Sequence, residues 1–172
     1  RDSNRFSAVK VDESSGDVIN HGSVGTSANL TVTGLTRDVS SPSGIGDGMS
    51  GAGIGGGDYA TTTEVNAYKF LHDGSSWSIT YWSQMTELPT SSTTETFIFG
   101  NVWTDDQGTG LMVRTSYVSA SSGAKLNVIT AANNNSTPLN LTTDDLFIPD
   151  TTDWHFYALT FDGTTLTMQR DN

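Results

Sequence analysis

The side chains best suited to coordinate a metal ion are two adjacent aspartates in a polar loop. Asp105 and Asp106 precede Gln107 and Gly108, between two stretches with strand character. Because Ca²⁺ prefers hard oxygen ligands from carboxylates and backbone carbonyls of a loop, the pattern predicts a Ca²⁺ site with Asp105 and Asp106 as ligands. Asp144 with Asp145, and Asp150 with Asp153, offer alternative ligands. The chain contains no D-x-D-x-D-G motif, so a solvated acidic turn is the other interpretation of this loop.

Paired catalytic groups, by contrast, are missing from the sequence. Hydrolysis of a glycosidic bond needs two carboxylates that flank the bond, and on a strand this requires acids two residues apart on one face. None of the four glutamates has an Asp or Glu two positions away. The sequence also lacks a G-x-S-x-G nucleophile elbow, and its three histidines stand far apart. We therefore expect a protein that is not an enzyme, with a glycoside hydrolase as the least favoured hypothesis.

Trp82 is the main candidate for contact with a ligand. In the stretch 77–85, Trp77, Ile79 and Tyr81 alternate with Ser78, Thr80 and Trp82, so Trp82 lies on the face opposite the apolar one. An aromatic plate with nearby amide groups is suited to a sugar ring, which predicts a carbohydrate site formed by Trp82 with Asn133 and Asn134 at its rim. Two alternatives stay open: a long loop covers Trp82, or the asparagines only form a turn.

Composition and charge exclude several classes of partner. The 172 residues carry a net charge of −11 and 15 of the 19 acidic residues are Asp. A chain so short of Lys and Arg is unsuited to nucleic acid, whose phosphates require cationic side chains, and to an anionic membrane surface. Cysteine is absent, and no run of apolar residues is long enough to span a membrane. The length suits a single domain over residues 1–172.

Short strands joined by turns must position these residues. Abundant Thr, Ser, Gly and Asp favour strands and tight turns, and helix signals are confined to one turn within 64–71. In 94–103, simple alternation places Phe97 and Phe99 on one face. The Asp162-Gly163 dipeptide between alternating stretches predicts a hairpin. The expected strands cover residues 5–12, 29–36, a short piece of the Gly/Ser-rich tract 40–58, 77–85, 94–103, 110–119, 125–130, 154–161 and 165–170.

Three of these stretches resemble one family. WSITYW (77–82), GLMV (110–113) and TDWHFYALTFDGTTLTMQRDN (152–172) are similar, in order and spacing, to strands of the concanavalin A-like, laminin-G-like domains. The resemblance implies an all-β fold, an antiparallel β-sandwich of jelly-roll type, with Ca²⁺ at its rim. It also implies one or two closing strands after the last hairpin, so we expect either a truncated chain or a closing strand from another chain. Residues 1–28 are expected to form a loosely packed N-terminal arm.

The sequence therefore favours a non-catalytic recognition module, extracellular or on a virion surface, that binds a glycan or surface polysaccharide and serves in adhesion. The alternative is a structural coat protein with a lectin-like fold, such as a phage capsid decoration or tail protein. Its partners would be neighbouring coat subunits, and a homo-oligomer is one form of such an assembly. Neither hypothesis involves nucleic acid or membrane insertion.

Overall fold

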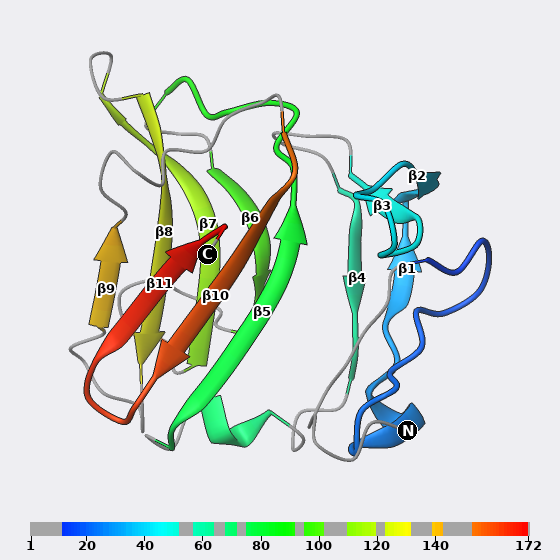
Figure 1. Cartoon of the computed structure of the whole chain (residues 1–172), viewed down its shortest axis with the longest axis horizontal. Helices are drawn as coiled ribbons and strands as arrows, with labels where there is room; N and C mark the ends of the chain where they lie inside the picture. The colour runs from blue at the N-terminus through cyan, green and yellow to red at the C-terminus, as the bar shows by residue number, and fades with distance from the viewer. Residues whose placement is uncertain are drawn as a thin grey trace. The chain divides into compact units, whose positions relative to one another are not determined.

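The computed structural model (Figure 1) describes residues 12–51, 57–63, 68–71, 75–91, 95–101, 110–119, 123–131, 139–142 and 153–171, with the backbone alone for Lys69, Ala131 and 139–142. Strands dominate these residues, and every described sheet is antiparallel, which confirms the all-β prediction. No helix in the described part of the chain is long and apolar enough to cross a membrane. Arg1–Tyr68 and Lys69–Asn172 form two compact units. Organisation of residues 1–172 as a single domain stays a prediction.

The unit Arg1–Tyr68 contains two small sheets, one formed by β1 with β4 and the other by β2 with β3. The strand expected over 29–36 is divided, because Gly34 has φ +75° and separates β1 from β2. A side chain on Gly34 would also collide with the Asp58 carboxylate, so this position requires glycine. The expected strand over 5–12 lies almost wholly outside the described residues. The elements of this unit are the 3₁₀ turn η1 Gly25–Ala28, β1 Thr31–Thr33, β2 Thr36–Val39, β3 Gly48–Ser50 and β4 Tyr59–Thr61.

A hydrogen-bonded loop precedes β1 in this unit. The backbones of Val18 and Leu30 exchange hydrogen bonds at 2.8 and 2.9 Å. Within the loop, the buried Asn20 side chain accepts from Gly22 N at 2.9 Å and donates to Gly25 O at 3.1 Å. The Asn20 amide satisfies backbone groups that water cannot reach, so it fixes the path of the chain into η1.

The unit Lys69–Asn172 contains a hairpin sheet and a meander sheet. The hairpin sheet has the order β11–β10–β5, and the meander sheet has the order β6–β7–β8–β9. The predicted pairing of 110–119 with 125–130 is confirmed by β7 and β8. The elements are the 3₁₀ turn η2 Lys69–Leu71, β5 Trp77–Ser83, β6 Glu95–Gly100, β7 Gly110–Ser119, β8 Gly123–Ala131, β9 Leu139–Thr142, β10 His155–Phe161 and β11 Leu166–Arg170.

The predicted hairpin at Asp162-Gly163 is confirmed, with Gly163 and Thr164 as its two central residues. The Asp162 N–H donates to Thr165 O at 3.3 Å, which closes the turn. Gly163 has φ +100°, the conformation that a type II′ turn requires at its first central position. Asp162 therefore flanks the turn, and its carboxylate is free to hydrogen-bond to the loop backbone.

The hairpin sheet has an apolar inner face and a polar outer face, as alternation over 77–85 predicts. In the ladder, Trp82 pairs with Phe156 and Ile79 pairs with Leu159, so the faces of β5 and β10 coincide. The inner face carries the buried side chains of Trp77, Tyr157, Leu159, Phe161 and Met168. The outer face carries the exposed side chains of Ser78, Thr80, Trp82, Thr160, Thr167 and Gln169.

β6 departs from simple alternation. Phe97 pairs with Arg114 and Phe99 pairs with Val113, so the ladder with β7 shifts by one residue at Ile98. Because neighbouring residues of β7 point to opposite faces, this bulge places Phe97 and Phe99 on opposite faces of the meander sheet. Phe97 is 60% exposed, whereas the Phe99 ring packs edge-on against Tyr81, with centroids 4.9 Å apart. The expectation that Phe97 and Phe99 share a face is wrong for this reason.

The Tyr81–Phe99 contact joins the inner face of the hairpin sheet to the meander sheet. Tyr81 also stacks on Tyr157 of β10 at 5.0 Å. Burial, with a smaller contribution from Tyr157, raises the pKa of Tyr81 far above its ordinary value. The phenol therefore stays neutral, which suits an apolar contact between sheets. Figure 1 shows β10 and β11 of the hairpin sheet drawn in front of β7 and β8.

Replacing Thr115 by valine is expected to stabilise the protein. Thr115 is fully buried in β7, and its hydroxyl has no hydrogen-bond partner among the described residues. A buried unpaired hydroxyl costs about 1–3 kcal/mol, and valine has nearly the same shape without that group. We expect Thr115→Val to raise the free energy of unfolding by about 1 kcal/mol, measured by urea titration. The exposed Thr80→Val is the control, and a lower midpoint for Thr115→Val alone would contradict the prediction.

Candidate functional site

The outer face of the hairpin sheet carries an aromatic pair, Trp82 and Phe156. These residues are directly opposite each other on β5 and β10, with ring centroids 5.4 Å apart and planes inclined by 54°. Trp82 is 42% exposed and Phe156 is half-buried. An exposed indole supported by a second ring offers a rigid apolar surface with a polar N–H, which suits a ligand with both apolar and hydroxyl faces.

Asp171 fixes the backbone on which Phe156 stands. The Phe156 N–H donates to Asp171 Oδ1 at 2.9 Å, and the Asp171 N–H donates to Phe156 O at 2.9 Å. Asp171 Oδ2 lies 2.5 Å from His155 Nδ1 and 3.6 Å from Arg170 Nε. The carboxylate therefore ties the end of β11 to the start of β10, beside the aromatic pair.

Asp171→Asn is expected to reduce stability at neutral pH but not in acid. Burial works to raise the pKa of Asp171, but the hydrogen bond from the Phe156 N–H, together with His155 and Arg170, outweighs it and leaves the pKa below its ordinary value. Because the pKa of Asp171 is lower in the folded than in the unfolded protein, the ionised carboxylate stabilises the fold at every pH above the ordinary carboxyl pKa. This stabilisation is lost as the pH falls through the pKa of the folded protein. Urea midpoints from pH 7 to pH 2 should therefore converge for the two proteins. A constant difference across that range would contradict the prediction.

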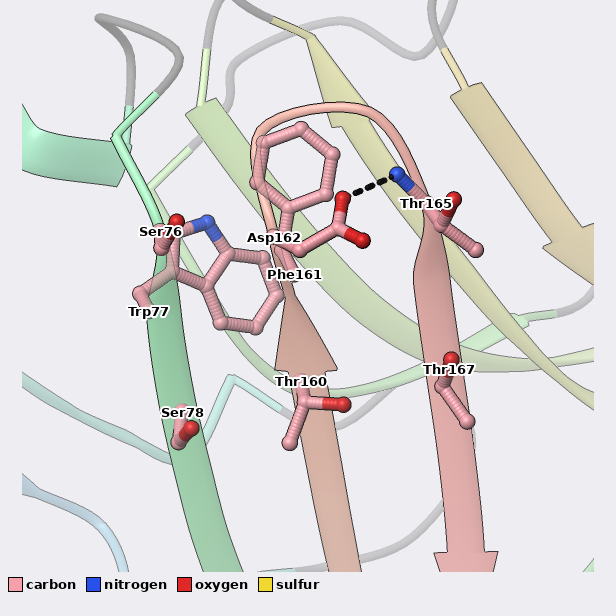
Figure 2. Close-up of a pocket in the computed structure, with 8 residues that line it drawn as sticks. All are labelled: Ser76, Trp77, Ser78, Thr160, Phe161, Asp162, Thr165 and Thr167. Carbon is pink, nitrogen blue, oxygen red and sulfur yellow. Dashed lines mark hydrogen bonds between the residues drawn. The ribbon is translucent and has the colours of Figure 1, made fainter.

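A pocket of about 390 Å³ lies near the turn end of the same sheet (Figure 2). Asp162 Oδ1 accepts from the backbone N–H groups of Thr165 at 2.7 Å and Thr164 at 2.8 Å. Both hydrogen bonds lower the pKa of Asp162, and the one from the Thr165 N–H has the larger effect. The Asp162 carboxylate is therefore ionised at neutral pH. In Figure 2 the dashed line joins one carboxylate oxygen of Asp162 to the Thr165 nitrogen, and no line joins its second oxygen. The pocket is lined by Ser76, Trp77, Ser78, Thr160, Phe161, Asp162, Thr165 and Thr167.

The outer face of the meander sheet is different in kind. Arg114 Nη1 lies 2.6 Å from Glu95 Oε2, and Arg114 Nε donates to Asn127 Oδ1 at 3.2 Å. These polar groups lie on the same face as Phe97, because Glu95 and Phe97 are two residues apart on β6 and every second side chain of a strand points to the same face. Glu95 is thus engaged in an ion pair with Arg114.

The structure describes one of the five residues predicted to bind ligand or metal. Trp82 lies on the exposed outer face, next to the aromatic partner Phe156. Asp105, Asp106, Asn133 and Asn134 lie outside the described residues, so the Ca²⁺ site and the asparagine rim stay predictions. In the part of the chain that the structure describes, no group of three or more His, Asp or Glu side chains could hold a metal ion.

Phe156 and the hydroxyl pocket were not predicted from the sequence. Alternation places Phe156 on the outer face of its strand, but only the β5–β10 register sets it opposite Trp82. The Asp162-Gly163 dipeptide marks the turn without showing which side chains gather beside it.

Comparisons of the chain with protein-family models, with curated proteins and with solved structures give no match. The resemblance to laminin-G-like domains therefore depends on the sequence motifs alone.

Proposed function

We propose that the chain is a non-catalytic carbohydrate-recognition module whose binding surface is the outer face of the hairpin sheet. The observation that carries the proposal is the aromatic pair, a 42% exposed Trp82 packed on Phe156. Hydroxyl side chains of Ser78, Thr80 and Thr160 extend from it along the same face. Aromatic stacking with adjacent hydrogen-bonding groups is the usual composition of a surface that selects a polar ligand with apolar faces.

The fold proposed to support this surface is a jelly-roll β-sandwich of the concanavalin A-like, laminin-G-like kind. Support comes from the three motifs and from the Tyr81–Phe99 contact between the sheets of the second unit. An extracellular or virion-surface location, with adhesion as the role, is part of the same proposal. Ca²⁺ at Asp105 and Asp106 is its proposed metal.

A glycan array tests the proposal directly. The full chain, labelled at its N-terminus, would be applied to diverse immobilised glycans with 1–5 mM Ca²⁺ or with EDTA. Binding to a chemically related set of glycans is the expected result, and dependence on Ca²⁺ would support the metal site. Absence of binding across the array under both conditions would refute the carbohydrate function.

A second candidate function is a structural coat subunit, favoured by one specific observation. The bulge in β6 turns Phe97 outward, where it is 60% exposed, and Val118, near the end of β7, is 47% exposed. The exposed Phe97 ring, on a face that also carries the Glu95–Arg114 pair, is suited to contact with a neighbouring subunit. Sedimentation of the wild type and of Phe97→Ser would test this. A monomer for both proteins at high concentration would count against self-assembly through this face.

A further inference from the structure

The hydroxyl pocket and the aromatic pair belong to one continuous strand surface. Ser78 and Trp82 are four residues apart on β5, and Thr160 and Phe156 are four residues apart on β10, all on the outer face. Four residues of strand span roughly 13 Å. A single elongated ligand that lies along the strands can therefore reach both ends, while a small one contacts only the aromatic pair or only the pocket.

The pocket is rich in groups that bind hydroxyls. Five of its eight lining residues carry a side-chain hydroxyl: Ser76, Ser78, Thr160, Thr165 and Thr167. Each hydroxyl can donate and accept, whereas the Asp162 carboxylate can only accept. A ligand with many hydroxyl groups can pair with the pocket hydroxyls and with the carboxylate, because each ligand hydroxyl can donate or accept a hydrogen bond. This composition favours a saccharide over a ligand that offers only acceptors.

The charge in the pocket disfavours anionic ligands. Asp162 is the one charged side chain in the lining, and its Oδ1 is already engaged by the Thr164 and Thr165 N–H groups. Its second oxygen is left to accept from a ligand hydroxyl, a charge-assisted bond stronger than a neutral one. A uronate or sialate carboxylate here would meet a like charge, and the net charge of −11 adds to that repulsion. A cationic ligand gains little, because an ion pair with a fully exposed carboxylate is weak.

We infer that the outer face of the hairpin sheet binds a neutral, extended oligosaccharide, with one part stacked on Trp82 and another hydrogen-bonded to Asp162 in the hydroxyl pocket. This inference rests on the proposed carbohydrate function and names the ligand class that the site selects. Affinity should rise with chain length until the oligosaccharide spans both ends. Neutral chains should bind about two- to fivefold more tightly than uronate chains of equal length.

The test uses calorimetry with neutral gluco-, manno-, galacto- and xylo-oligosaccharides of two to six units, and with oligouronates of the same lengths. Asp162→Asn keeps an acceptor for the Thr164 and Thr165 N–H groups but removes the charge. It should weaken the longer neutral chains about tenfold, the cost of a bond to a charged group, and should reduce discrimination against uronates. Thr160→Val removes a pocket hydroxyl without a change of shape and should weaken the same chains. Asp17→Asn, an exposed acid outside the pocket, is the control.

The outcomes separate the two levels of the proposal. If neutral chains bind through Trp82 but Asp162→Asn and Thr160→Val leave affinity and selectivity unchanged, the pocket is not part of the site. In that case the inference is overturned and the carbohydrate function stands. If oligouronates bind as tightly as neutral chains, the ligand class is wrong. If no oligosaccharide binds, both fail. Urea midpoints for each variant show whether a loss of affinity reflects unfolding.

Discussion

Trp82→Ala is expected to weaken oligosaccharide binding by roughly thirtyfold or more while leaving the protein folded. Removal of an anchoring tryptophan from a binding surface typically costs at least about 2 kcal/mol, which corresponds to that factor. Trp82 is 42% exposed on the outer face, so its side chain contributes much less to the interior than to this surface. Phe156 loses its ring partner in the variant, which removes a further part of the aromatic surface. Calorimetric titration with the best-binding oligosaccharide measures the change.

Phe97→Ala is the matched control for Trp82→Ala. Phe97 is also an exposed aromatic residue on a strand of the same unit, but it lies on the meander sheet, opposite the face that bears Phe99. If the binding surface is the aromatic pair, Phe97→Ala should leave the affinity unchanged, and Trp82→Phe should retain most of it. Equal losses for Trp82→Ala and Phe97→Ala would point to a general effect on the fold rather than to a site. Loss with Phe97→Ala alone would move the binding surface to the other sheet.

The strands were predictable because their side chains alternate between a polar and an apolar environment. Over 77–85 and 154–161 the period of two in the sequence matches the burial along β5 and β10. The 110–119 stretch was predicted with its observed bounds, because Gly110 and the polar loop after Ser119 mark both ends. The same rule failed for β6, since a bulge depends on how two strands pair and leaves no mark on either strand alone.

The candidate site was predictable only in part, for a related reason. Trp82 could be assigned to the outer face from its own strand, because a single apolar residue among Ser and Thr is conspicuous there. Phe156 could not be assigned as its neighbour, because that requires the register between segments about seventy residues apart in the chain. The pocket depends on the same register, combined with the position of Asp162 beside the turn rather than at its centre.

Leu159→Ala is expected to have the largest effect on stability. Leu159 is fully buried on the inner face of β10, between Ile79 of β5 and Met168 of β11 in the ladder. Replacing a buried leucine by alanine removes apolar contacts and leaves a cavity, at a cost of about 2–5 kcal/mol. For a chain of this size, each kcal/mol lowers the midpoint of thermal unfolding by roughly 2–4 °C. Urea and thermal titrations, followed by tryptophan fluorescence, measure the loss.

The contrast between Leu159→Ala and Trp82→Ala tests the two-faced character of the hairpin sheet. Because residues on β10 and β5 alternate between faces, the inner substitution should lower stability and leave the affinity of the folded protein unchanged. The outer substitution should do the reverse. Thr80→Ala, exposed on the outer face of β5 and outside the pocket lining, should change stability by no more than about 0.5 kcal/mol. If Leu159→Ala were as mild as Thr80→Ala, the inner face would not be the core of this unit, and a ligand surface on the opposite face would lose its structural basis.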